Sequence, residues 1–339
     1  ESQERMAVLI EADKFEEFKQ LAYEENLDSC IVAVVTEERR LVMSFHGEEI
    51  VNISRDFLDT NGVRGLQDVL IREGLSDTDP FHSKVTSVEE NLKQPNVASQ
   101  IGLAEMFDAS IGKSTVLMPF GGKYQLTETE GSVQKLPVFG FTNTCSIMTH
   151  GYHPELSLYS PYLGASYSVV EALARVTAMG GNYETCRLTN QEYFERLHTD
   201  PEKWGKPMQA LLGLIEAEMA FETPAIGGKD SMSGTFNDIS VPPTLITFAV
   251  TTEKTEHIIS PEFKEAGHHI YYIKHTPNDN QTPNYEELKA NFAKVRELIR
   301  KGVICSAATV KFGGLAEALC KMSFGNKIGV EVKTSEHIF

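Results

Sequence analysis

A glycine-rich segment holds the residues best suited to chemistry. Residues 224–234 read PAIGGKDSMSG, in which a short apolar strand precedes two glycines, a cation, an acid and hydroxyl groups. Glycines let backbone N–H groups approach an anion closely. Lys229 could neutralise a phosphate, Asp230 could hold a metal or a hydroxyl group, and Ser231 could bond an oxygen atom. The alternative is a glycine turn between two strands with solvated polar side chains, and the GxxxxGK[ST] pattern of a P-loop is absent.

Three other places could take part in a site. Glu171 lies on or near the apolar face of a helix expected at 165–179, where a carboxylate needs a partner, a metal, water or access to solvent. Asn190 follows an expected strand, where a loop could meet a ligand. The glycines at 313–314 precede a helix, so they either bind an anion at its N-terminus or permit close packing.

The N-terminal residues Glu1, Ser2 and Gln3 offer a dense set of hydrogen-bonding groups ahead of an apolar stretch. The alternative is a solvated, frayed terminus.

Apolar spacing predicts an α+β arrangement around these residues. Strands are expected at 6–10, 30–36, 41–45, 123–127, 138–142, 224–226, 245–250, 269–273 and 328–332. Helices are expected at 15–22, 66–71, 99–110, 165–179, 207–221, 285–301 and 315–322.

Composition narrows the class of protein. The chain has 339 residues, a formal net charge of −17 and five widely spaced cysteines. The length suggests two or three domains, and the negative charge argues against nucleic acid and anionic membranes as partners. No apolar run approaches the ~18 residues that a membrane-spanning helix needs. We therefore expect a cytoplasmic protein with reduced thiols.

Several motifs together resemble the phosphoribosylformylglycinamidine synthase family. They are ESQERM at 1–6, NVAS at 96–99, SPYLGA at 160–165, GGKDSMSG at 227–234 and GGLAEAL at 313–319. The resemblance covers nearly the whole chain in the family's order. It implies an α+β fold, with an aminoimidazole ribonucleotide synthetase-like N-domain (a mixed sheet with helices on one face) flanked by partial α/β C-domains.

The family's synthetase core has two tandem halves, and the resemblance divides the chain accordingly. Residues 1–58 would be the tail of the first half's C-domain, and 59–87 a connector. Residues 88–252 would be the second half's N-domain, and 253–339 its truncated C-domain.

The resemblance also implies an activity. Family members are ligases of purine biosynthesis that use ATP, Mg²⁺ and glutamine-derived ammonia to convert formylglycinamide ribonucleotide to formylglycinamidine ribonucleotide. Carried over by motif, the expected roles are substrate binding for Glu1, Ser2, Gln3 and Ser231, nucleotide binding for Asn190, Gly228 and Lys229, and metal binding for Glu171 and Asp230. No catalytic residue is expected in this chain.

Departures from the family pattern concern a second, auxiliary metal–nucleotide site in this half. An acid-bearing DxSDGG motif is expected where residues 309–314 read TVKFGG, and Arg175 stands where an Asn is expected one turn after Glu171. Phe139 stands where a metal-binding Asp is expected. Glu171 alone cannot hold magnesium well, so these departures argue against an intact auxiliary site.

Two parts of the family's enzyme are not recognisable, namely the first N-domain and the glutaminase domain. We therefore expect a fragment that is inactive alone and that pairs as a homodimer through 88–252 in place of its missing partner domain. The alternatives are a non-catalytic scaffold half or another synthetase of the same fold.

Overall fold

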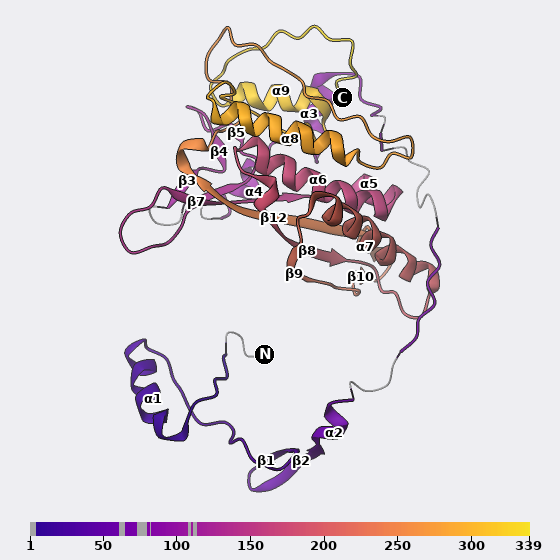
Figure 1. The fold of residues 1–339 in the computed structure, drawn as a ribbon. Coiled ribbons are helices and arrows are strands. Elements are labelled where there is room, and N and C mark those ends of the chain that lie inside the picture. Colours follow the sequence, from indigo (N-terminus) through magenta and orange to yellow (C-terminus); the bar gives the residue numbers. More distant parts are fainter. Residues whose placement is uncertain (1–4, 61–64, 73–79, 82, 108–109, 111–113) are drawn as a thin grey trace. The chain divides into compact units, whose positions relative to one another are not determined.

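The computed structural model describes residues 5–60, 65–72, 80–81, 83–107, 110 and 114–339. The chain divides into two compact units, residues 1–66 and 67–339, and each is described by itself (Figure 1).

The first unit combines a helix with a β-hairpin. Its elements are a 3₁₀ turn Ala12–Lys14, α1 Phe15–Glu24, β1 Arg40–Phe45, β2 Glu48–Ser54 and α2 Arg55–Leu58. His46 and Gly47 both have positive φ angles, 50° and 85°, which is the conformation that a tight antiparallel hairpin favours. The strands expected at 6–10 and 30–36 are not formed, because no neighbouring strand among the described residues supplies their ladder hydrogen bonds.

The second unit is built on a six-stranded sheet with the order β3-β6-β7-β12-β8-β9. The strands are β3 Thr115–Leu117, β6 Ser132–Lys135, β7 Thr144–Gly151, β8 Arg187–Tyr193, β9 Ala225–Lys229 and β12 Thr244–Lys254. β8 and β9 are parallel, whereas the other neighbouring strands are antiparallel. The mixed sheet expected from the sequence is therefore confirmed.

Two long helices cover one face of this sheet (Figure 1). α6 Pro161–Ala178 packs on β7 and β12, and α7 Pro201–Phe221 packs on α6. Each begins with a capping side chain, Ser160 or Asp200, followed by proline at the first helical position, where its missing N–H costs nothing. Their buried faces and the sheet form the main apolar core.

Shorter elements surround this core. They are α3 Val88–Lys93, α4 Ile101–Ala104, β4 Phe120–Gly121, β5 Thr127–Glu128, α5 Pro154–Tyr159, the 3₁₀ turns Tyr183–Thr185 and Thr255–His257, β10 Thr235–Phe236, β11 Ile239–Ser240, α8 Tyr285–Arg300 and α9 Gly314–Phe324. α8 joins the core through Leu288 and Phe292. None of the helices in the described part of the chain is long and apolar enough to cross a membrane.

Several shorter expectations for this unit were wrong. The helix expected at 66–71 is extended chain at its described positions, and Leu70 N donates to Pro201 O at 2.9 Å. The helix expected at 99–110 shrinks to α4, and the strand expected at 123–127 shrinks to the start of β5. No strand forms at 138–142, 269–273 or 328–332. As in the first unit, apolar runs without a paired neighbour stay extended but irregular.

Candidate functional site

The sheet brings most of the expected site residues to one end. Gly151 on β7 pairs with Thr247 on β12, Thr247 pairs with Asn190 on β8, and Asn190 pairs with Gly228 on β9. These four residues form one row across the sheet. Neighbouring strands are about 4.8 Å apart, so the row spans about 14 Å. The glycine-rich segment lies at one side of the row and the residues after Gly151 at the other.

The two glycines of the segment have different roles. A Cβ atom on Gly228 would lie 2.6 Å from the backbone oxygen of Asn190, so only glycine lets β9 lie this close to β8. A Cβ atom on Gly227 would meet nothing within 4 Å. Gly228 therefore has a structural reason to be glycine, whereas Gly227 has open space beside it.

Backbone hydrogen bonds continue past the end of β9 and hold the following residues in place. Ser231 N donates to Glu192 O at 3.0 Å, and Phe194 N donates to Ser231 O at 2.9 Å. Lys229 Nζ lies 4.7 Å from the centre of the Tyr193 ring, a cation–π contact that leaves the ammonium group exposed. An exposed ammonium group and a partly exposed hydroxyl on a fixed backbone can together receive an anionic ligand.

Asn190 does not lie in a loop after a strand, as expected, but inside β8. Its side chain is 7% exposed and faces the helices. Asn190 Nδ2 donates to Glu218 Oε1 on α7 at 3.0 Å, and Oδ1 has no hydrogen-bond partner. The loop expectation failed because β8 starts at Arg187 and continues past Asn190 to Tyr193.

Sequence reasoning missed Glu192, which is also 7% exposed and lies on the same strand face as Asn190. Its Oε1 is buried without a hydrogen-bond partner. Burial, and secondarily the negative charge of Asp230, raise the pKa of Glu192 to about 7. The available indication was an acid at a position where the strand's alternation requires a buried side chain.

Glu171 lies at the other side of the row and has its own partners. Its carboxylate accepts from Tyr152 N at 3.1 Å and pairs with Arg175 Nη2 at 2.5 Å. Arg175 Nε also lies 3.9 Å from Glu130 Oε2. Of the explanations open for a carboxylate on this helix face, the described contacts give a protein partner. As a metal ligand, Glu171 stays a prediction.

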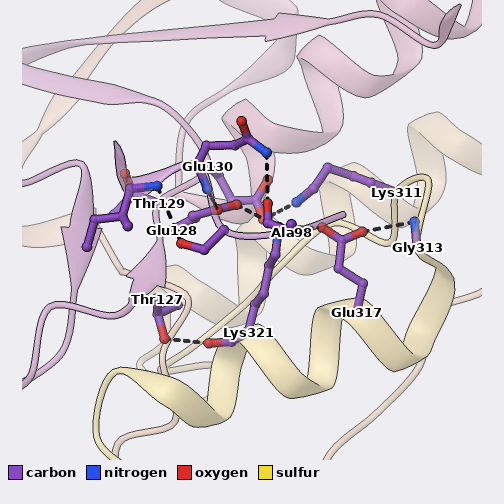
Figure 2. Close-up of polar contacts among 12 residues, drawn as sticks. Ala98, Thr127, Glu128, Thr129, Glu130, Lys311, Gly313, Glu317 and Lys321 are labelled. Atoms are coloured by element: carbon purple, nitrogen blue, oxygen red, sulfur yellow. Dashed lines mark hydrogen bonds and ion pairs between the residues drawn. The ribbon is translucent and has the colours of Figure 1, made fainter. Parts of the chain in front are cut away.

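Glu130 is the centre of a buried polar network between the sheet and the segment before α9. Thr309 donates to it from N at 3.1 Å and from Oγ1 at 2.7 Å, and Lys311 Nζ lies 3.3 Å away (Figure 2). Burial opposes ionisation of Glu130, but Lys311, Arg175 and the Thr309 hydrogen bonds outweigh it and lower its pKa.

The same network extends along α9. Glu317 accepts from Gly313 N at 2.9 Å, and Lys321 Nζ pairs with Glu317 at 2.8 Å and with Glu128 at 2.7 Å (Figure 2). The Gly313 N–H at the start of α9 is thus occupied by a carboxylate of the chain itself. This favours the packing interpretation of the two glycines at 313–314 over anion binding.

The remaining expected substrate ligands, Glu1, Ser2 and Gln3, lie outside the described residues. Among the described residues, no group of three or more His, Cys, Asp or Glu side chains could hold a metal ion.

Comparison with known proteins gives consistent matches over the whole chain. No profile of a known protein family matches. The phosphoribosylformylglycinamidine synthase subunit PurL of Methanocaldococcus jannaschii is 24% identical over 99% of this chain and 48% of its own length. The PurL subunit of Thermoplasma volcanium is 25% identical over 98% of this chain and 46% of its own. The resemblance expected from the sequence is confirmed.

Solved structures of Thermotoga maritima PurL share the fold. Its ATP complex aligns with a TM-score of 0.65 at 17% identity, covering 99% of this chain and 50% of that one. Its complex with FGAR aligns with a TM-score of 0.56 at 16% identity, covering 86% and 42%. The chain therefore spans about half the length of the relatives that it matches, and the α+β fold expected from the sequence is that of PurL.

Proposed function

We propose that this chain is part of a phosphoribosylformylglycinamidine synthase, the ATP-dependent carbon–nitrogen ligase that converts formylglycinamide ribonucleotide and glutamine to formylglycinamidine ribonucleotide. Similarity to PurL subunits over 98–99% of this chain, and 46–48% of theirs, supports the assignment, as do PurL complexes with ATP and with FGAR. The single observation that carries it is the row across the sheet, which gathers Asn190, Gly228 and the residues up to Ser231 at one end of the fold.

In this proposal the residues after β9 bind ligand. Lys229 and Gly228 contact nucleotide together with Asn190, and Ser231 contacts substrate together with Glu1, Ser2 and Gln3. Lys229 supplies a charge-assisted hydrogen bond to a phosphate, and the space beside Gly227 lets the phosphate approach the backbone. Mg²⁺ would supply charge neutralisation between nucleotide and protein, with Asp230 as its proposed ligand at this side of the row. Glu171, the other proposed metal ligand, lies at the opposite side of the row and would hold a separate ion.

The test is kinetic and uses the complete enzyme that contains this chain. Ser231→Ala should lower kcat/KM for formylglycinamide ribonucleotide about tenfold, near the ~1.4 kcal/mol of one lost hydrogen bond. Ser240→Ala is the matched control, because Ser240 lies in β11 and its hydroxyl contacts Thr235. Kinetics of Ser231→Ala equal to those of the control would reject the ligand-binding role of these residues.

The 339-residue chain by itself should make no product, even with ammonium salt in place of glutamine, because it spans about half the length of its PurL relatives and the proposed reaction needs the other half as well. Measurable ATP-dependent turnover by the purified chain would contradict this. We also propose that the chain forms a homodimer through 88–252, which sedimentation at high micromolar concentration would disprove by showing a monomer.

A scaffold role is the second candidate, and it is favoured at one side of the row. There Arg175 and Lys311 already occupy the carboxylates of Glu171 and Glu130. Charges that satisfy each other stabilise the packing of the chain and leave little for a ligand to bind. The two candidates therefore apply to different sides of one sheet end.

A further inference from the structure

A β-bulge interrupts the pairing of β9 with β8 just before the two glycines. Leu188 pairs with Ala225. The next residue on β8, Thr189, pairs with Gly227 and not with Ile226. Ile226 is therefore an extra residue on β9, so that two residues of one strand oppose one residue of the other. A bulge changes the face of the sheet to which each later side chain points, so its position decides how the glycine-rich segment presents its side chains.

Glu218, in the last turn of α7, holds the residue before this bulge. Its Oε2 atom accepts from Ala225 N at 3.4 Å, and its Oε1 atom accepts from Asn190 Nδ2 at 3.0 Å. Its backbone oxygen also accepts from Thr223 N at 3.1 Å, within the turn that joins α7 to β9. One partly buried residue thus connects α7, β8 and the start of β9.

The two glycines do not by themselves define the register of β9. Gly228 lies opposite Asn190, where a Cβ atom would meet the backbone oxygen of Asn190 at 2.6 Å. If the bulge were lost and the segment moved by one residue, Gly227 would take that place without a Cβ atom. Lys229 would then lie opposite Glu192, whose buried carboxylate would attract the ammonium group. The shifted register is therefore a close competitor of the observed one.

The start of β9 has little freedom to move. Only residues 222–224 join α7 to β9, and Pro224 O accepts from Leu188 N at 3.1 Å. Relaxation of the bulge must therefore move the glycine-rich segment and not the start of the strand. The backbone hydrogen bonds beyond the bulge, including that from Ser231 N to Glu192 O, can re-form one residue along, because residues 225–234 contain no proline.

We propose that Glu218 is a positioning residue that fixes the bulge at Ile226 and thereby keeps Lys229 on the face where it can meet a ligand. In the observed register Lys229 lies opposite Gln191, and its ammonium group is exposed over the Tyr193 ring. A shift by one residue would turn this side chain to the opposite face, because side chains alternate along a strand. The register depends on contacts of the chain alone, and only its effect on catalysis rests on the proposed function.

The test follows the contact between Lys229 and Tyr193 in the 339-residue chain without ligand, by nuclear Overhauser effects after selective isotope labelling of lysine and tyrosine. The original chain should show this contact, because the ammonium group lies 4.7 Å from the ring centre. Glu218→Ala should lower its intensity about fivefold or more, while circular dichroism shows a folded chain. If Glu218→Ala does not fold, Glu218→Gln replaces it, since glutamine keeps one of the two acceptor oxygens.

Two further variants separate a shift of register from a general loss of stability. Gly227→Ala added to Glu218→Ala should restore the contact, because the alanine Cβ atom would meet Asn190 O in the shifted register but has open space in the observed one. Glu216→Ala is the matched control on the same helix. Glu216 accepts a hydrogen bond from Tyr162 on α6, so this variant should keep the contact.

The complete enzyme provides a kinetic measurement. Glu218→Ala should raise KM for ATP about tenfold or more and change kcat less, because it removes a binding contact to the nucleotide. An undiminished contact between Lys229 and Tyr193 in folded Glu218→Ala would overturn the role of Glu218, and so would a contact that Gly227→Ala fails to restore. A normal KM for ATP in a variant whose register has shifted would support the role of Glu218 and count against nucleotide binding by Lys229.

Discussion

Replacing Gly228 with alanine tests whether the close contact between β8 and β9 determines this end of the sheet. The added Cβ atom would lie 2.6 Å from Asn190 O, whereas ordinary contact begins at 3.4 Å. The strands would have to separate by roughly 0.8 Å, which would stretch ladder hydrogen bonds of about 2.9 Å beyond their normal range. Forced overpacking of this kind costs about 1–3 kcal/mol of unfolding free energy.

Gly227→Ala is the matched control on the neighbouring residue. Its Cβ atom would meet nothing within 4 Å, and its backbone is outside the left-handed region. The control should therefore change the unfolding free energy by less than about 0.5 kcal/mol, or stabilise slightly by restricting the unfolded chain.

Urea denaturation of both variants measures the difference, and hydrogen exchange at the amides of β9 locates it. For a unit of this size, each kcal/mol lost should lower Tm by about 2–4 °C. Faster exchange should appear in β9 of Gly228→Ala and not in that of Gly227→Ala. Equal stabilities and equal exchange rates in the two variants would refute the argument that the close strand approach requires glycine.

Two further predictions concern buried charges. Arg175→Met should cost about 3–5 kcal/mol in urea denaturation, because it leaves the buried Glu130 and the partly buried Glu171 without this cation. Adding Glu171→Gln should recover part of the loss, and a loss below about 1 kcal/mol would contradict the pairing. Glu253 is also buried, but His257, Lys254 N and Arg300 outweigh that burial and lower its pKa from 4.5 to about 2. Because the folded pKa is the lower one, Glu253 stabilises the fold above about pH 4.5 and loses this effect as the pH falls to about 2. Glu253→Gln should therefore lose less stability than the original chain across that range, as measured by circular dichroism, and parallel acid curves would show that Glu253 plays no part.

The long helices were predictable because their apolar spacing and end residues agree. The helices expected at 165–179 and 207–221 exist, but both begin earlier, at Pro161 and Pro201. Ser160 and Asp200 cap those starts, and a serine or aspartate followed by proline is the pattern that marks a helix start. Periodicity locates the buried face of a helix, and the capping residues locate its end.

Strands were harder to predict because a strand needs a partner. The apolar runs at 30–36 and 269–273 satisfy a strand's composition, but no neighbour pairs with them among the described residues. The same limit applies to the site. Residues 227–231 could be picked out by type, because they are adjacent in sequence. Glu192 could not be linked to Asp230 without the parallel register of β8 and β9, which a single sequence does not contain.

The row of paired residues across the sheet has two sides, one next to β7 and one next to β9. Buried carboxylates are paired with cations at the first side but not at the second, and this difference indicates where a ligand could bind. Glu130 is buried, yet its pKa is lowered, because Thr309, Lys311 and Arg175 supply hydrogen bonds and positive charge. Glu192 is also buried, and this burial, with the like charge of Asp230 as a smaller cause, raises its pKa to about 7, because no cation among the described residues lies beside it to offset the burial. A metal ion at Glu171 would have to displace Arg175 and leave that cation buried, at a cost of several kcal/mol. On the β9 side, Asn190 Oδ1 and Glu192 Oε1 are buried without a hydrogen-bond partner. The side next to β9 is therefore where buried polar groups remain for a ligand to satisfy, whereas the charges at the other side already satisfy each other.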